Sequence, residues 1–163
     1  MDRMDYKEIL IQIRRIVRSI NLESKKIQKD FSVSIPQILC LEYLKASPNY
    51  QATQREIREH LSLNSSTVTG IISRLENRGL LARLPKSGDK RVTHITLTSA
   101  GYELLKETPG LLQGRLATKL KHLSDEELSD MSKSLDLLTE MLEIEKSEAV
   151  PVIMAEVDDE RQE

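Results

Sequence analysis

The chain has 163 residues, with 24 Lys and Arg against 26 Asp and Glu, one Cys and no Trp. This length suits one domain of ordinary size. Apolar runs reach only four residues, whereas a membrane-spanning helix needs about 20, and the first residues lack the apolar region of a secretory signal. We therefore expect a cytoplasmic protein without a membrane segment, and a single cysteine excludes an internal disulfide.

Charge is distributed unevenly along the chain. Residues 1–121 carry 21 Lys and Arg but 12 Asp and Glu, whereas residues 122–163 carry 3 and 14. The formal net charge of −2 therefore hides a basic body. Two interpretations of the acidic end stay open. In the first, the acidic end is a solvated helix followed by a disordered tail over 147–163. In the second, the tail screens the basic body or keeps the protein soluble.

Two helices are predicted at the start of the chain. Apolar residues recur at three- and four-residue steps over 5–29, between Arg and Lys side chains, which is typical of an amphipathic helix. Ser34 and Pro36 begin a second helix, and 47–49 ends it. The first helix has an apolar seam that must be buried.

The next segment predicts two short helices joined by a tight turn. Thr53 and Glu56 have the spacing of a capping box, which starts the first of them. After a turn over 62–64, Asn64 or a neighbouring serine caps the second, and Gly79 ends it in a left-handed conformation. One side of this second helix is an apolar stripe, formed by Val68, Ile71, Ile72 and Leu75.

A basic hairpin follows, because the runs 80–84 and 92–97 have the composition and length of strands. The loop between them, 85–91, carries three cations. Two short helices followed by such a hairpin are the outline of a winged helix-turn-helix. We therefore predict a mainly α fold with a small β-hairpin wing, with the winged helix-turn-helix over 53–98.

The C-terminal part predicts further helices. One is capped near Thr98 and interrupted at 109–110, and another begins at a second capping box, Ser124 to Glu127. Its apolar residues step by three and four, as in a coiled coil, as far as about Lys146.

The apolar seams at the two ends are too long for the core of one small domain to bury. We therefore expect a single domain over 1–146 that forms a homodimer, with dimerisation helices over 5–46 and 99–146.

The candidate DNA-binding residues lie on the second short helix and on the hairpin. A helix in a major groove about 12 Å wide must present a face without bulky apolar groups, and basic side chains bind phosphates. Gly70 costs roughly 1 kcal/mol of helix propensity against Ala, which close approach to DNA or to a neighbouring helix would explain. The candidates are Ser65, Ser66, Thr67, Thr69, Gly70, Ser73, Arg74, Lys86, Lys90 and Arg91.

Two residues of the hairpin receive a structural role. Asp89 can pair with Arg83 or Arg91 and hold the loop in shape. We prefer this structural role for Asp89 and Arg83 because an acid has no attraction to phosphate.

We interpret Cys40, which lies in an apolar run, as a small buried hydrophobe. No metal-binding spacing, cofactor motif or catalytic constellation is present in the sequence, so an enzyme is not expected.

Four segments carry a family resemblance: 61–69 (LSLNSSTVT), 75–83 (LENRGLLAR), 89–91 (DKR) and 97–101 (LTSAG). Together they resemble the signature of MarR-type transcriptional regulators, with similarity over 5–145. The resemblance implies a dimeric winged-helix repressor that binds a pseudo-palindromic double-stranded DNA operator and has room for a small-molecule effector. It places Ser65, Ser66, Thr67, Thr69, Arg74 and Arg91 on DNA-contacting positions.

Residues 13–25 and 34–37 are similar to the regulators of compatible-solute (ectoine) synthesis and uptake within that family. This branch implies repression of osmolyte genes at low external salt, with ionic strength as part of the signal. The residues themselves leave a second function open, a winged-helix module that docks a protein partner without specific DNA binding.

Overall fold

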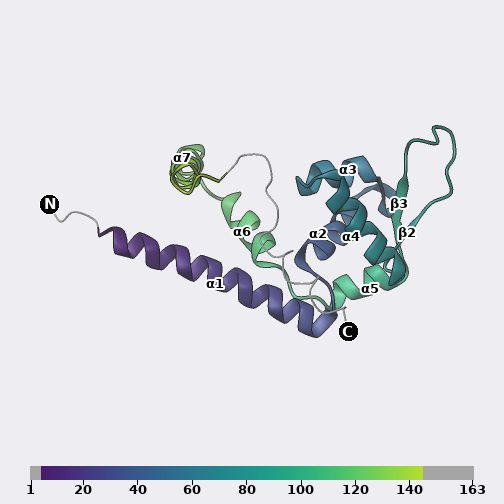
Figure 1. The fold of residues 1–163 in the computed structure, drawn as a ribbon, viewed down its shortest axis with the longest axis horizontal. Helices are drawn as coiled ribbons and strands as arrows, with labels where there is room; N and C mark the ends of the chain where they lie inside the picture. Colours follow the sequence, from purple (N-terminus) through teal and green to yellow (C-terminus); the bar gives the residue numbers. More distant parts are fainter. Residues whose placement is uncertain (1–4, 145–163) are drawn as a thin grey trace.

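The computed structural model describes residues 5–144, which form seven α-helices and one small sheet (Figure 1). The predicted mainly α fold with a hairpin wing is confirmed, and the predicted tail over 147–163 lies outside the described residues. The elements are α1 (Tyr6–Phe31), α2 (Ile35–Ala46), the 3-10 turn η1 (Pro48–Tyr50), β1 (Gln51–Thr53), α3 (Gln54–Leu61), α4 (Ser65–Asn77), β2 (Leu81–Arg83), β3 (His94–Leu97), α5 (Ser99–Glu107), α6 (Leu112–Leu120) and α7 (Asp125–Met141).

Local signals start the helices where the sequence predicts. The Glu56 backbone N–H donates to Thr53 Oγ1 at 3.1 Å, and the Thr53 N–H donates to the Glu56 carboxylate at 2.7 Å. These bonds to Thr53 hold the pKa of Glu56 below its ordinary value. Ser124 and Glu127 form the same capping box at α7. Asn64, rather than a neighbouring serine, caps α4.

The helix ends are partly as predicted. Gly79 has a left-handed φ of 69° and ends α4, and the break at 109–110 separates α5 from α6. The prediction that α7 continues to about Lys146 is wrong. This helix ends at Met141, because the backbone of Glu143 is left-handed, with a φ of 54°.

The sheet has three antiparallel strands in the order β1-β3-β2. The sequence did not predict β1. The hairpin strands are shorter than the predicted 80–84 and 92–97, because the N–H of Leu80 bonds to the last turn of α4 and that of Val92 closes a turn onto Asp89. The wing loop between the strands is correspondingly longer than predicted.

The hydrophobic core lies within the winged-helix lobe, which we define as α2 to α5 with the sheet. Helix α1 contributes Ile27 near its C-terminal end, and Leu111 covers the core just before α6. The largest fully buried side chains are Ile27, Ile38, Leu41, Leu44, Ile57, Ile71, Ile72, Leu75, Leu81, Ile95, Val33 and Val68.

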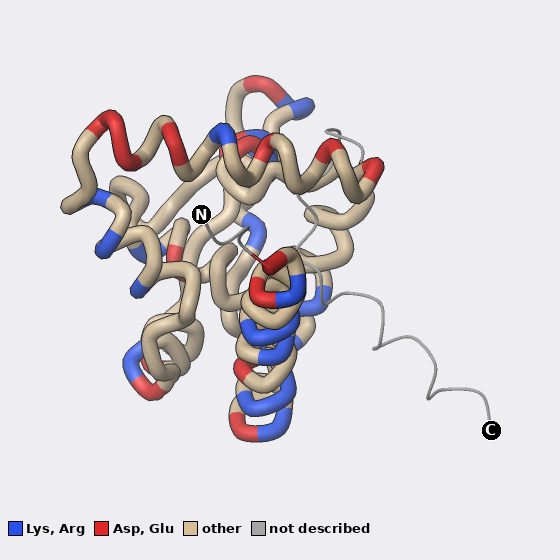
Figure 2. Tube along the Cα trace, turned by 90° about the vertical axis from the view of Figure 1, so that its left-hand side faces the viewer, with Lys and Arg blue, Asp and Glu red and all other residues tan. Residues whose placement is uncertain are grey.

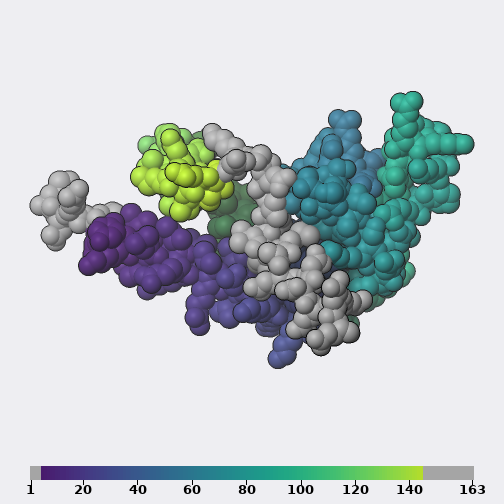
Figure 3. Space-filling view, in the orientation of Figure 1, coloured from purple at the N-terminus to yellow at the C-terminus, as the bar shows by residue number. Residues whose placement is uncertain are grey.

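Helices α1, α6 and α7 extend away from the winged-helix lobe, on the side opposite the wing (Figures 1 and 3). Lys and Arg recur along α1, whereas Asp and Glu dominate α7 (Figure 2). Both helices leave large apolar side chains exposed. On α1 these are Tyr6, Ile9, Leu10, Ile16, Val17 and Leu22; on α7 and the residues after it they are Leu128, Met131, Leu135, Leu137, Met141, Leu142 and Ile144.

Polar contacts connect α1 to both α6 and the end of α4. The Glu23 carboxylate accepts from the backbone N–H of Leu112 at 2.6 Å and so supplies an acceptor at the N-terminus of α6. The Arg78 guanidinium, at the end of α4, donates to the carbonyl oxygens of Phe31 and Ser32, at the end of α1. The orientation of α1 is thereby coupled to both α6 and α4.

Gly101 provides a test of this packing. A Cβ placed on it would lie 2.0 Å from the carbonyl oxygen of Leu80, so Gly101→Ala must displace backbone. We expect it to lower the free energy of unfolding by about 1–3 kcal/mol, measured by urea denaturation at fixed protein concentration. Gly114→Ala is the control, because its Cβ would meet nothing within 4 Å; equal stability of the two variants would contradict this packing.

Candidate nucleic-acid interface

Helix α4 has one buried face and one exposed face. Its apolar stripe, from Val68 to Leu75, is at most 1% exposed, because it packs on the core of the winged-helix lobe. Ser65, Ser66 and Thr69 lie on the exposed face. The burial of the stripe therefore decides which side of α4 is available to a ligand.

Gln54 places the wing on the same side of the molecule as this exposed face. Its backbone N–H donates to the carbonyl of Thr93, at the root of the wing, at 3.0 Å. Its side-chain Nε2 donates to Thr69 Oγ1 at 2.8 Å. One residue at the start of α3 therefore contacts both parts of the candidate interface.

The hydroxyl groups in the first turns of α4 are bonded in specific directions. Thr69 Oγ1 donates to the carbonyl of Ser65 at 2.8 Å. Ser66 Oγ donates to Asn64 Oδ1 at 2.8 Å, and the same oxygen accepts from the N–H of Thr67 at 2.8 Å. Thr67 is half-buried, so Ser65, Ser66 and Thr69 form the exposed part of this group.

The second half of α4 holds the wing. The Arg83 guanidinium pairs with Glu76, and its other nitrogen donates to Ser73 Oγ at 3.1 Å. The backbone N–H of Arg83 also donates to Glu76, at 3.3 Å. The proposed pairing of Arg83 with Asp89 is thus corrected: the strand turns Arg83 back towards α4, away from the loop tip. Ser73 is half-buried in this contact.

Within the wing loop, Asp89 contacts Arg91 through the backbone rather than through the guanidinium group. Its Oδ1 accepts from the backbone N–H of Arg91 at 3.0 Å, and Lys86 Nζ donates to the carbonyl of Lys90 at 3.0 Å. Gly88 provides a left-handed φ of 71° at the tip. The side chains of Lys86, Lys90 and Arg91 are exposed on a loop that projects from the body of the molecule (Figures 1 and 3).

Gly70 has no packing reason within the described chain. A Cβ at this position would meet nothing within 4 Å. Of the two explanations offered by the sequence, close approach to a neighbouring helix is therefore not supported by residues 5–144. The other explanation, that Gly70 allows close approach to DNA, remains.

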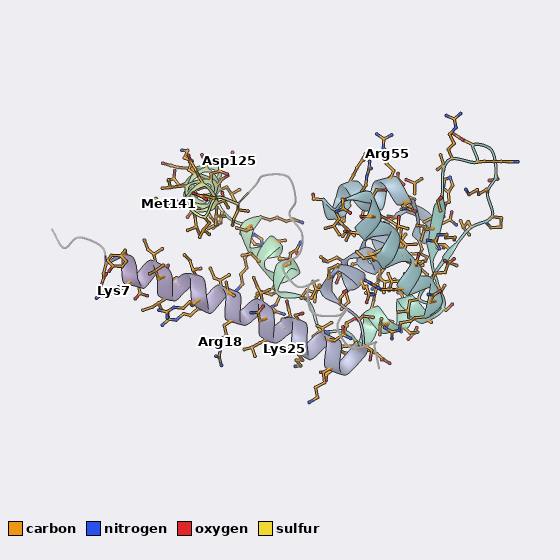
Figure 4. All side chains as sticks on the ribbon, in the orientation of Figure 1. Lys7, Arg18, Lys25, Arg55, Asp125 and Met141 are labelled. Carbon is orange, nitrogen blue, oxygen red and sulfur yellow. The ribbon has the colours of Figure 1, made fainter. Side chains whose placement is uncertain are left out.

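Two residues of α3 join the candidate site without having been predicted. Gln54 contacts Thr69 as described, and Arg55 extends from α3 towards the side on which the wing projects (Figure 4). Arg55 pairs with Glu59 at 2.9 Å, which raises the pKa of Arg55. The only sequence signal for either residue was its position directly after the Thr53 cap.

Other chemistry-bearing residues are placed elsewhere. Cys40 is fully buried, and burial raises the pKa of its thiol to about 12, which agrees with a buried hydrophobe. His60 stacks on Tyr43 with ring centroids 4.2 Å apart. Among residues 5–144, no cluster of three metal-ligating side chains occurs, and no described helix is long and apolar enough to span a membrane.

The helix-turn-helix of α3 and α4, the sheet beside it and the projecting hairpin define a winged helix-turn-helix protein. The MarR family model matches residues 33–93. The organic hydroperoxide resistance transcriptional regulator of Bacillus subtilis is 31% identical over 129 residues, covering 77% of this chain and 82% of that protein. The chain belongs to the MarR family of transcriptional regulators, as the motifs had predicted.

Solved structures show the same fold. The complex of MepR from S. aureus with DNA has a TM-score of 0.60 at 24% identity, covering 86% of this chain and 99% of that one. Sco3205, a MarR family regulator from Streptomyces coelicolor in complex with DNA, has a TM-score of 0.60 at 22% identity, covering 93% and 96%. The architecture described above is therefore that of known family members.

Proposed function

We propose that this protein is a sequence-specific DNA-binding repressor, acting in the cytoplasm on a double-stranded, pseudo-palindromic operator. The observation that carries the proposal is the placement of Gln54, which brings the exposed face of α4 and the basic wing to one side. Relatives named as transcriptional regulators support it, as do homologous structures in complex with DNA.

The candidate interface divides into two chemical parts. The first two turns of α4 present small polar groups, Gly70 and no bulky apolar side chain, which suits entry into a major groove. The wing presents Lys86, Lys90 and Arg91, which suit phosphates or an adjacent minor groove. Arg74, exposed on α4, adds a further cation, and Ser73 contributes through the wing contact with Arg83.

Neutralising the wing should weaken DNA binding in a salt-dependent way. We expect Arg91→Gln and Lys90→Gln each to lower affinity for every sequence and to reduce the slope of log K against log salt by about 1 per lost phosphate contact. The measurement is a titration of the full chain against its own upstream DNA and a shuffled sequence at several salt concentrations.

Lys133→Gln is the matched control, because Lys133 lies on α7 and pairs with Asp130 at 3.5 Å. It should leave affinity and slope unchanged. If the wild-type chain fails to distinguish its upstream DNA from the shuffled sequence, and the wing variants bind as it does, the repressor proposal fails in favour of a module that docks a protein partner.

We further propose that the protein is a homodimer held together by α1 and α7. Their exposed apolar side chains form long seams, and burial of each such side chain contributes about 1.5–3 kcal/mol. A twofold dimer would present two α4 helices to successive half-sites roughly 34–36 Å apart.

A charge placed in the α7 seam tests the dimer. Leu135 is 55% exposed in the single chain, so Leu135→Asp should leave the fold intact while disfavouring association. Sedimentation or light scattering should show a dimer for the wild type and a shift to monomer, by at least tenfold in dissociation constant, for the variant. Lys133→Asp, beside the seam, should remain dimeric; a wild-type monomer at micromolar concentration would refute the proposal.

Within the family, the N-terminal similarity supports a role in compatible-solute (ectoine) synthesis and uptake, with osmolarity, an ion or a small molecule as effector. Deleting the gene in its source organism should raise transcripts of those genes at low external salt, with little change at high salt. Unchanged transcripts at both salt levels would remove this assignment and leave DNA binding unaffected.

A further inference from the structure

We infer that Thr69 is a specificity-determining residue that reads the 5-methyl group of a thymine in each half-site. This inference rests on the proposed function and deepens it. Thr69 lies one turn after Ser65 on the exposed face of α4, between the helix N-terminus and the half that holds the wing.

The hydrogen of the Thr69 hydroxyl is already donated to a hydrogen bond within the protein. Oγ1 donates it to the Ser65 carbonyl at 2.8 Å, and a hydroxyl has one hydrogen to donate. Oγ1 also accepts from Gln54 Nε2 at 2.8 Å, which occupies one of its two lone pairs. The side chain is left with a methyl group and one lone pair for a ligand.

Gln54 is itself held in place, so its side chain does not rotate freely away from Thr69. Its backbone is bonded to Thr93, its side chain is half-buried, and it is the first residue of α3. The two bonds on Oγ1 fix the χ1 angle of Thr69, which is stiff because the side chain is β-branched. The methyl group therefore has a fixed position on the exposed face.

This pattern discriminates between bases in the major groove. Guanine presents two acceptors there, N7 and O6, and a hydroxyl without a spare hydrogen cannot donate to either. Thymine presents a methyl group beside its O4, and contact of a threonine methyl with it needs no hydrogen. Ser65, Ser66 and Ser73 carry hydroxyls but no methyl, so among the candidate residues of this face Thr69 and the half-buried Thr67 alone carry one.

Replacement of thymine by deoxyuridine tests the inference, because it removes only the methyl group. The full-length protein first selects its preferred duplex from a random pool, and each thymine of that duplex is then replaced by uracil, in symmetric pairs. For wild type, one symmetric pair should weaken binding by about fourfold per half-site, the effect of one buried methyl group, or roughly fifteenfold for both.

Two variants separate the methyl from the hydroxyl. Thr69→Ser keeps the hydroxyl and its two bonds, and should bind the thymine and uracil duplexes equally. Thr69→Val keeps a methyl without the hydroxyl, and should retain the uracil penalty. Ser65→Ala, one turn away, is the control and should retain the penalty at the same pair.

The experiment distinguishes failure of this inference from failure of the proposed function. If wild type selects a sequence but no thymine in it is sensitive to uracil, or if Thr69→Ser keeps the full penalty, the inference is wrong and the proposed function stands. A selected sequence whose half-sites lack thymine overturns it equally. If wild type enriches no sequence at all, both the proposed function and this inference fall.

Discussion

The burial of one stripe of α4 is the constraint on which the rest of the candidate interface depends. Val68, Ile71, Ile72 and Leu75 are fully enclosed by the winged-helix lobe, and each contributes about 1.5–3 kcal/mol by leaving water. The helix cannot rotate without exposing them. Its opposite face is therefore fixed towards solvent, and hydrogen bonds such as those of Thr69 with Gln54 and Ser65 then orient the side chains on that face.

The two halves of α4 then have different tasks. The first two turns carry the exposed hydroxyl groups, while Ser73 and Glu76 in the later turns hold Arg83 at the start of the wing. Arg78, at the end of the same helix, contacts the end of α1. One helix thus sets the position of the wing and of the proposed dimerisation helix.

The sequence predicted those features that depend on neighbouring residues. The capping boxes, the left-handed Gly79, the stripe of α4 and the break at 109–110 are local signals, and the structure has them. The three residues of β1 carry no strand signal of their own, because they become a strand only by pairing with β3. Two side-chain contacts depend in the same way on how distant segments meet. One is the bond between Gln54 and Thr69, and the other is the pairing of Arg83 with Glu76 rather than with Asp89.

Amide hydrogen exchange of the full chain, with and without its selected DNA duplex, tests the central claim most directly. The account predicts that DNA protects residues 65–70 of α4 and residues 86–91 of the wing, while exchange along α7 stays unchanged. Protection confined to α1 and α7, with none on α4 or the wing, would contradict it.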